Sequence, residues 1–280
     1  MSEGATLTPG SARSLLQTIL GEMVWPTGTP VWTSTLVHVL GGLGIEEQTA
    51  RQAIARAGAQ GWIVPERRGR EVRWSLAPRL ASIFETGSRR VLSLSDPFPD
   101  WDGTWLALLV TIPAARRQAR RPLYAGLTWA GLGNPVPGLW VSPHVERREE
   151  VRRLVDELDL RAHTLALVGT VDSIGVDEAT IVEHGWDLDG LAEHYAQMLK
   201  AIEHLEPAPG DDTLFAFLRM VSEWQELPRT DPQLPEALLP DWIGRRVAGR
   251  IEELRAQWTP EARRRFAELD SGGSLRSAGA

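Results

Sequence analysis

The sequence contains no cysteine, and this absence removes several kinds of site at once. A chain without thiols forms no disulfide, no thiolate zinc site and no cysteine nucleophile, and it suits a reducing compartment. The first twenty residues lack a basic segment followed by an apolar run, so we expect no signal peptide. No apolar stretch reaches the roughly 20 residues of a membrane helix. We therefore expect a cytoplasmic protein with no membrane partner.

Common catalytic and cofactor motifs are missing as well. The sequence has no G-x-S-x-G turn, no P-loop, no H-E-x-x-H helix and no glycine-rich dinucleotide turn. Two of the six histidines, His194 and His204, fall on one expected helix, but ten residues separate them. Two histidines on a helix chelate one metal ion when they are four residues apart, as in H-E-x-x-H. We predict that the protein is not an enzyme and holds no cofactor or metal.

The net charge of −7 is unevenly distributed along the chain. Residues 1–91 contain ten arginines and seven glutamates, whereas residues 92–180 and 181–280 are both net acidic. Nucleic-acid binding depends on the local basic surface rather than on the total charge, because counterions are released where phosphates are neutralised. The N-terminal third is therefore the region in which a nucleic-acid interface is expected.

The pattern of apolar residues divides the chain into three expected domains of an α+β protein. Residues 11–94 carry short helices and a hairpin, and two prolines near 95–100 interrupt the pattern. Residues 100–176 alternate strands with helices, which favours a ferredoxin-like α+β domain. The strands are expected at Trp105–Ile112, Gly138–Pro143 and His163–Val171. Residues 180–270 show helical periodicity, with separate helices expected at 241–257 and 260–269 because Thr259-Pro260 is typical of a helix start.

The first domain has the segment order of a winged helix-turn-helix. Short helices over 11–23 and 33–40 are followed by glycines and by a third helix from Ile45. Ala50, Ala53, Ile54 and Ala57 repeat at helical spacing and form its inward stripe. The outward side chains suit contacts in a DNA groove, since arginine pairs with guanine and glutamine with adenine. These candidate DNA-binding residues are Gln48, Thr49, Arg51, Gln52 and Arg56.

A basic hairpin follows this helix and completes the winged-helix pattern. Strands are expected at 62–64 and 71–76, joined by the turn Glu66-Arg67-Arg68-Gly69-Arg70. The glycine permits the turn, and the arginines of a wing can contact phosphates or a minor groove. Arg67, Arg68 and Arg70 are therefore candidate DNA-binding residues.

Taken together, the segments resemble the PaaX family of bacterial repressors, which control aromatic catabolism such as that of phenylacetate. The middle domain opens with Trp101-Asp102-Gly103-Thr104-Trp105, similar to the family's WDGxW. Residues 231–244, DPQLPEALLPDWIG, are close to its DPxLPxxLLPxxWxG. The resemblance covers roughly residues 11–258. We interpret the second motif as an extended segment that delivers Leu234, Leu238, Leu239 and Trp242 to a helical surface for packing.

The resemblance implies a homodimer on palindromic operator DNA that is released by an aryl-acyl-CoA such as phenylacetyl-CoA. The phosphates of CoA require cations. A cluster in the first helix of the middle domain is the candidate effector site, with Arg116, Arg117, Arg120, Arg121 and Trp129 as its residues. The alternative for this cluster is a solvated charged face with Trp129 in the core.

Two other function classes fit parts of the sequence. A metal-dependent nuclease is one, because ferredoxin-like domains can act on nucleic acid. That activity needs carboxylates that converge at strand ends, and only Asp102 precedes the first middle-domain strand. A protein-interaction adaptor is the other, since small three-helix units with hairpins also serve as docking modules.

Overall fold

The computed structural model describes residues 7, 10–69, 71–78, 80, 84, 101–227 and 230–277. The chain forms two compact units, and each unit collects segments that are far apart in the sequence. One unit contains Met1–Ser93, Gln197–Glu226 and Val247–Ala280. The other contains Leu94–Ala196 and Leu227–Arg246. The expected boundary near 95–100 lies outside the described residues.

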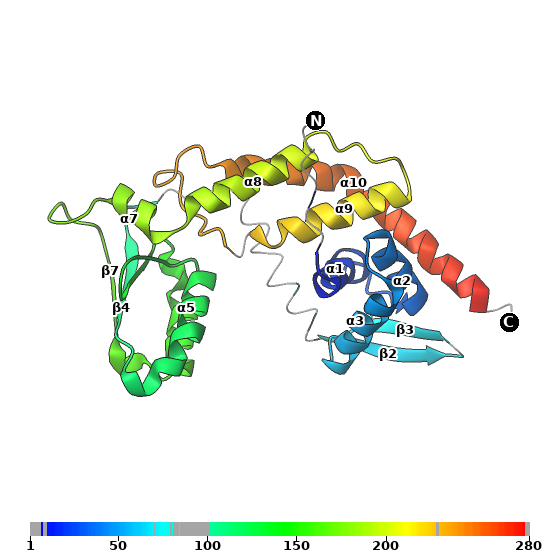
Figure 1. Ribbon diagram of the computed structural model, residues 1–280, viewed down its shortest axis with the longest axis horizontal. Helices are drawn as coiled ribbons and strands as arrows, with labels where there is room; N and C mark the ends of the chain where they lie inside the picture. The colour runs from blue at the N-terminus through cyan, green and yellow to red at the C-terminus, as the bar shows by residue number, and fades with distance from the viewer. Residues whose placement is uncertain are drawn as a thin grey trace. The chain divides into compact units, whose positions relative to one another are not determined.

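The first unit contains a winged helix-turn-helix together with helices from the C-terminal part of the chain (Figure 1). A three-stranded antiparallel sheet has the order β1-β3-β2. The winged-helix elements are α1 (Ala12–Ile19), the π-helical turn η1 (Leu20–Val24), β1 (Val31–Trp32), α2 (Thr33–Gly42), α3 (Glu47–Ala59), β2 (Ile63–Arg68) and β3 (Glu71–Leu76). The three helices and the hairpin confirm the predicted α+β order, while the two-residue strand β1 was not expected.

Helices α9 (Asp211–Trp224) and α10 (Ile243–Ser277) pack against this winged helix. Arg219 of α9 donates a hydrogen bond to the carbonyl oxygen of Gly42, at 2.9 Å. On α10, Arg255 donates from both terminal nitrogens to the two carboxylate oxygens of Glu22, at 3.1 and 3.0 Å. Glu22 is 9% exposed and lies in the π-helical turn. Because a bidentate arginine pair restricts geometry as well as adding energy, it fixes this turn on α10.

The second unit is built on a four-stranded antiparallel sheet of order β5-β6-β4-β7. Its elements are β4 (Trp105–Val110), α5 (Arg120–Trp129), β5 (Gly133–Val136), β6 (Leu139–Ser142), α6 (Arg148–Glu157), β7 (Thr164–Gly169) and α7 (Glu178–Gly185). In chain order the central part runs strand, helix, two strands, helix, strand, which is the predicted ferredoxin-like arrangement. Strand β5 is an addition to that prediction. Its sequence, GNPV, contains turn-forming residues and gave no strand signal.

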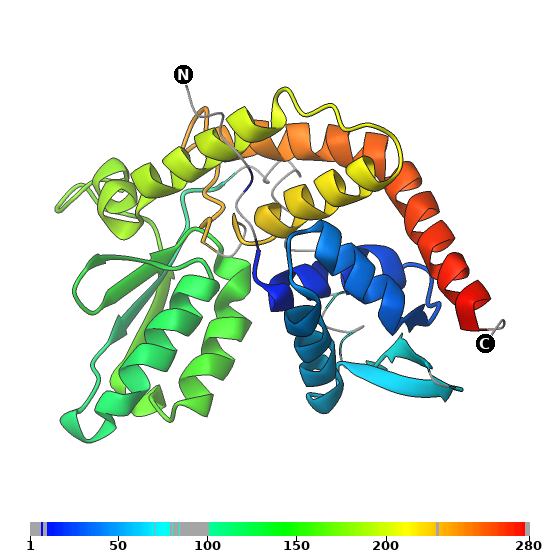
Figure 2. The same cartoon turned by 45° about the vertical axis from the view of Figure 1, so that its right-hand side comes forward.

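Helices α5 and α6 lie side by side and cover one face of this sheet (Figure 2). The core between them and the sheet contains Leu106, Leu108, Leu123, Leu127 and Val155, all buried. Residues 106 and 108 alternate with 105 and 107 along β4, so the two sets face opposite sides of the sheet. The sheet therefore has a second apolar face.

Part of that second face is covered by α7 and by the 231–240 segment. Leu234 is 1% exposed and clusters with Trp105, Val141 and Ile181. The sequence interpretation placed this motif on a helical surface, and the structure corrects it, because the main partner of Leu234 is the sheet face with α7. Leu238 and Leu239 pack at the edge of the same cluster.

A buried carboxylate anchors the start of this segment. Asp231 is 2% exposed and accepts hydrogen bonds from the Tyr195 hydroxyl at 2.7 Å, the Trp242 indole at 3.0 Å and the Gln233 backbone at 2.6 Å. Burial, followed by the nearby charge of Asp231, raises the pKa of Tyr195 strongly, so the phenol stays a donor. Three donors thus satisfy one carboxylate that would otherwise be costly to bury.

The C-terminal region is helical as predicted, with two differences. Helix α10 passes through Pro260 without a break, whereas separate helices were expected on either side. The helices of 180–270 are also shared between the units: α8 (Leu188–Ile202) and α10 each contribute residues to both.

Candidate nucleic-acid interface

Helix α3 packs against the other helices of the first unit through one narrow stripe of apolar side chains, most of which are alanines. Ala50, Ala53, Ile54 and Ala57 are at most 8% exposed, as the periodicity predicted. Small side chains allow a close approach to α1 and α2, which both contact this helix. The remainder of the helical surface is therefore free to carry polar residues outward.

All five predicted residues of α3 lie on this exposed surface: Gln48, Thr49, Arg51, Gln52 and Arg56. Arg51 forms an ion pair with Glu47 one turn earlier, at 2.8 Å, and both side chains are more than half exposed. Arg56 donates to the backbone oxygen of Gln52 at 3.3 Å. Exposed contacts of this kind contribute about 0–1 kcal/mol, so either arginine can leave its present partner for DNA at little cost in free energy.

The hairpin β2–β3 differs in register from the sequence interpretation. Strand β2 continues to Arg68, which pairs with Glu71, so Arg67 and Arg68 belong to the strand rather than to the turn. Gly69, with a φ of +64°, lies in the turn, where a left-handed conformation favours glycine. Both arginines are exposed, and Arg68 contacts Glu66 at 2.6 Å. Arg70 lies outside the described residues.

One indole fixes the hairpin on the helices. Trp74 of β3 donates from Nε1 to the Thr33 hydroxyl at 2.9 Å, and that hydroxyl donates to the Val72 carbonyl at 3.0 Å. A Cβ added to Gly58 of α3 would lie 2.9 Å from the Trp74 ring, so the glycine permits the close packing. Trp74 and Thr33 were not singled out from the sequence, because nothing local distinguishes a structural tryptophan from any other.

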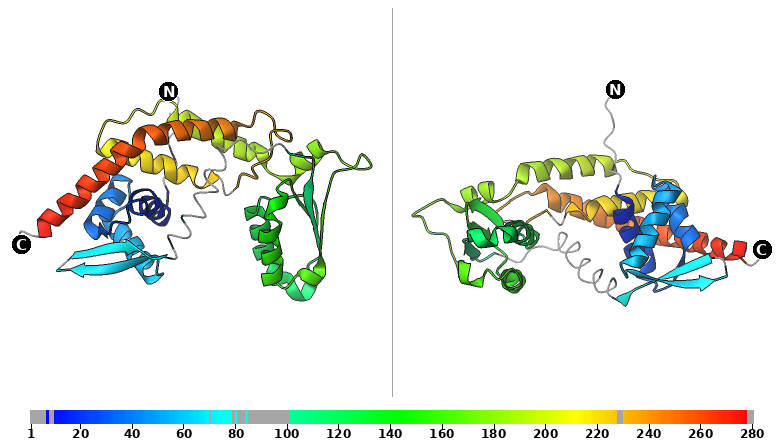
Figure 3. Two further views of the ribbon diagram at one scale, coloured as in Figure 1. Left: turned by 180° about the vertical axis from the view of Figure 1, so that it is seen from behind. Right: turned by 60° about the horizontal axis from the view of Figure 1, so that its bottom comes forward.

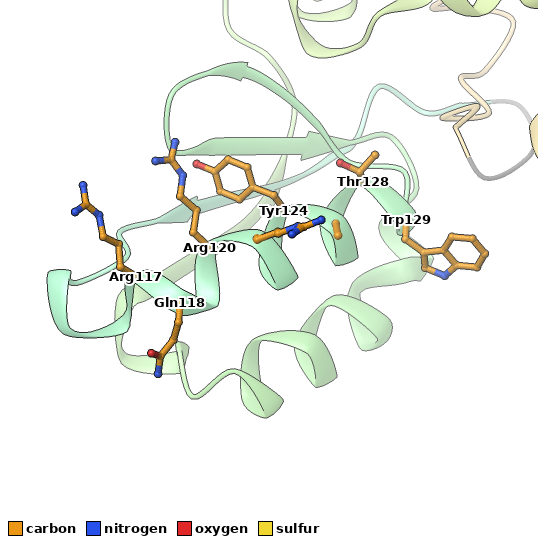
Figure 4. Close-up of a pocket in the computed structure, with 8 residues that line it drawn as sticks. Arg117, Gln118, Arg120, Tyr124, Thr128 and Trp129 are labelled. Atoms are coloured by element: carbon orange, nitrogen blue, oxygen red, sulfur yellow. The ribbon is translucent and has the colours of Figure 1, made fainter. Parts of the chain in front are cut away.

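In the second unit, the predicted arginine cluster forms one open depression of about 790 Å³ on α5 and the turn before it (Figure 4). Arg117, Arg120, Arg121 and Trp129 line it, together with Gln118, Tyr124, Ala125 and Thr128. The Arg120 guanidinium lies 5.2 Å from the Tyr124 ring centroid, in cation–π contact.

One member of the cluster departs from its predicted place, and another agrees with the prediction against its alternative. Arg116 does not line the depression and instead forms an ion pair with Asp159. Trp129 is 43% exposed, which excludes the alternative that places it in the core.

Two further observations concern the described residues only. No group of three or more histidine, aspartate or glutamate side chains converges there as a set of metal ligands. Asp102, the acid before β4, accepts a hydrogen bond from the Thr104 backbone at 2.9 Å, and bonding to Thr104 holds the pKa of Asp102 below its ordinary value. In the same part of the chain, no helix combines the length and apolar character required to cross a bilayer.

Three family models match the chain in succession. They are described as PaaX-like protein over residues 11–80, PaaX protein central Cas2-like domain over 99–181, and PaaX-like protein C-terminal domain over 186–268. The chain belongs to the PaaX family. The first match coincides with the winged helix, which contains α3 and the hairpin. The second includes the sheet and the arginine-lined depression of this PaaX-family protein.

A curated relative and a solved structure extend the comparison. The chain is 25% identical over 254 residues to the transcriptional repressor PaaX of Escherichia coli strain K12, covering 84% of this chain and 77% of the relative. The uncharacterized protein Rv0674 from Mycobacterium tuberculosis has the same fold, with a TM-score of 0.63 at 22% identity. That likeness covers 92% of this PaaX-family chain and 98% of the solved chain.

Proposed function

We propose that this PaaX-family protein is a sequence-specific DNA-binding transcriptional repressor. The observation that carries the proposal is the exposed polar face of α3 beside an arginine-bearing hairpin. Gln48, Arg51 and Gln52 offer the donors and acceptors that distinguish bases in the major groove. Arg67 and Arg68 on the hairpin are placed to neutralise phosphates. The similarity to a transcriptional repressor supports the same reading of the site.

The test begins with a duplex selected by the purified protein from a randomised pool. Arg51→Ala and Gln52→Ala should each weaken binding to this duplex by about 5- to 150-fold, since a base contact contributes roughly 1–3 kcal/mol. Arg152→Ala is a matched control, because Arg152 also pairs with an exposed glutamate, Glu149, one turn earlier. Unchanged affinity in both α3 variants, measured by gel shift, rules out α3 as the recognition helix.

The same selection separates the other two function classes. Cleavage of duplex DNA that depends on added Mg²⁺ would identify a nuclease. A chain that enriches no sequence and shifts no duplex would be an adaptor. A repressor shifts the selected duplex and leaves it intact.

We further propose that the repressor is a homodimer that joins its copies through the exposed edge of the sheet in the second unit. Leu165 and Leu167 on β7 are 55% and 59% exposed, and Leu109 on the neighbouring strand is 50% exposed. Strand β7 stands at the end of the described sheet order and carries no charged residue. Apolar edge strands without charges aggregate unless a partner covers them, and an antiparallel edge can pair with its own copy about a two-fold axis.

Leu165→Glu with Leu167→Glu should convert the dimer to a monomer, because each copy would place two carboxylates next to those of its partner where the two β7 strands pair. Ile174→Glu is the control, since Ile174 follows β7 and is 93% exposed. Sedimentation velocity measures the outcome. A double variant that stays dimeric moves the interface elsewhere.

We also propose that an aryl-acyl-CoA, such as phenylacetyl-CoA, binds the arginine-lined depression and releases the repressor from operators of aromatic-acid catabolism. Arg117, Arg120 and Arg121 supply three cations for phosphates, and the exposed Trp129 ring and the half-buried Tyr124 ring supply aromatic surface for stacking. A small carboxylate needs one arginine, so several arginines on one wall favour a ligand with several phosphates.

Fluorescence anisotropy of the labelled duplex tests this proposal. The thioester should release the wild-type protein, while phenylacetate at equal concentration should not. Changing Arg117, Arg120 and Arg121 to Gln should preserve DNA binding and abolish release, whereas Arg116→Gln, outside the depression, should leave release intact. Release of the triple variant at the wild-type thioester concentration would place the effector site elsewhere.

A further inference from the structure

Helix α2, which supports the recognition helix, lacks a cap of its own. Its N-cap residue is Trp32, whose side chain offers no acceptor, and no side-chain hydrogen bond from that residue caps the helix. The first residue inside the helix, Thr33, has its hydroxyl engaged with Trp74 and Val72. Backbone N–H groups at a helix start need acceptors, and a missing cap costs about 1 kcal/mol.

A different acceptor, for the N–H of the N-cap residue itself, comes from α10, more than two hundred residues later. One carboxylate oxygen of Asp270, Oδ1, accepts from the Trp32 backbone N–H at 2.9 Å and from the Thr35 hydroxyl at 2.8 Å. Figure 3 shows the C-terminal half of α10, in red, near the blue helices of the winged helix. In a capping box, a side chain from the third helical residue bonds to the N-cap N–H. Here Thr35 holds that third position, and Asp270 performs the acceptor role from a different helix.

The same carboxylate also contacts the sheet that carries the wing. Its second oxygen, Oδ2, lies 3.6 Å from the Arg73 guanidinium. Arg73 is on β3, donates to the Pro30 carbonyl at 2.8 Å and stacks over Trp32 with 4.8 Å between its guanidinium carbon and the ring centroid. Trp32 itself pairs with Arg73 in the β1–β3 ladder. Asp270 therefore ties together the start of α2, strand β1 and strand β3.

We propose that Asp270 is a positioning residue for DNA recognition: it fixes the angle between the helix pair and the wing. The inference rests on the proposed repressor function and adds a role for α10 in it. Recognition of a sequence requires α3 and the wing to meet the duplex together, in one geometry. Without the Asp270 carboxylate, the first turn of α2 and the wing strand β3 lose one of the anchors that they share, and the contacts of Thr33 with Trp74 and Val72 are left to hold them. A binding-competent geometry populated at one tenth raises the apparent Kd for the cognate duplex about ten-fold.

The experiment compares Kd values for the selected duplex and for a scrambled duplex, in full-length protein at a temperature well below the melting transition. Loss of folded protein weakens both affinities equally and leaves their ratio unchanged. Loss of positioning weakens mainly the selected duplex, because phosphate contacts tolerate a shifted geometry. Asp270→Ala should lower the ratio about ten-fold, and Asp270→Asn, which keeps an acceptor at Oδ1, should restore most of it.

Two further variants make the result specific. Glu252→Ala removes an exposed carboxylate from the same helix and should leave the ratio unchanged. Thr35→Val removes one of the two donors; it should lower the ratio in the wild-type background and have no further effect beside Asp270→Ala. If Asp270→Ala does not fold, the ratio of the two Kd values is compared among the wild-type protein, Thr35→Val and Asp270→Asn.

An unchanged ratio in Asp270→Ala, or in Thr35→Val should the alanine variant not fold, overturns the inference. In that case the wild-type protein still prefers the selected duplex, and the proposed repressor function stands. If the wild-type protein shows no preference for any duplex, the proposed function itself fails.

Discussion

Two adjacent glycines at the end of α2 provide a sharp test of how α9 docks on the winged helix. A Cβ added to Gly42 would lie 2.0–2.4 Å from carbon atoms of the Phe215 ring on α9, far inside van der Waals contact. A Cβ added to Gly41 meets nothing within 4 Å. The same substitution, glycine to alanine, can therefore be made at one position that faces Phe215 and at a neighbouring position of the same helix that faces no other atom within 4 Å.

Two opposing effects determine the expected difference in stability between the two alanine variants. Alanine is favoured over glycine in a helix by about 1 kcal/mol at both positions, or less near the helix end. Overpacking at Gly42 costs roughly 1–3 kcal/mol, because the Phe215 ring or helix α9 must move. We expect Gly41→Ala to leave the free energy of unfolding unchanged or to raise it. The Gly42→Ala variant should be less stable than the Gly41→Ala variant by roughly 1–3 kcal/mol. A difference of 1 kcal/mol corresponds to about 2–4 °C in Tm for a chain of this size.

Thermal melts followed by far-UV circular dichroism, supported by urea titration, measure the difference. Phe215→Leu should recover part of the stability in the Gly42→Ala background and none in the Gly41→Ala background. Gly42→Ala melting at or above the temperature of Gly41→Ala would refute the close contact between α2 and α9.

Asp231→Ala should destabilise the second unit by roughly 3–5 kcal/mol, since it removes the buried carboxylate to which three groups donate, and urea unfolding measures this loss. Arg67→Ala with Arg68→Ala should weaken binding to the selected and scrambled duplexes alike and reduce the log–log salt slope by about 0.9 for each lost phosphate contact, as measured by titration at several salt concentrations. The hydrogen bond from Arg265 lowers the pKa of Asp211 below its ordinary 3.8, so this contact stabilises the fold above that value and is lost as the pH falls through the folded pKa. Melts as a function of pH should therefore show a shallower loss of stability below about pH 4 in Asp211→Asn.

Helix α3 could be predicted because its pattern is local. Ala50, Ala53, Ile54 and Ala57 repeat at helical spacing, and the residues between them must then face outward. The wing register was only partly predictable. Glycine marked the turn correctly, but the pairing of Arg68 with Glu71, which extends β2, depends on contacts across the hairpin.

Helix α10 shows how packing can override a local signal. Thr259-Pro260 is typical of a helix start, because proline has no N–H to donate and crowds the preceding turn. Leu254, Trp258, Ala262 and Phe266 are nevertheless at most 7% exposed and lie four residues apart on one stripe across the proline. Burial of this continuous stripe outweighs the lost hydrogen bond, so a single helix forms where two were expected.

The arginine cluster was predictable in composition but not in detail. Three of its four arginines and Trp129 line one depression, whereas Arg116 pairs with Asp159. Asp159 lies 43 residues from Arg116 in the sequence, so no local sequence pattern predicts this ion pair. Asp270 and Trp32 illustrate the same limit at 238 residues.

That separation bears on how the protein is made. The contacts that tie α10 to the winged helix join residues 197–241 positions apart, so they form only after α10 has followed the winged helix out of the ribosome. The winged-helix segments are synthesised before α10, which supplies the acceptor for the Trp32 N–H. Folding of this unit therefore carries a high contact order and finishes only after α10 has been synthesised. A translation product that stops before Asp270 lacks this link between the start of α2 and strands β1 and β3.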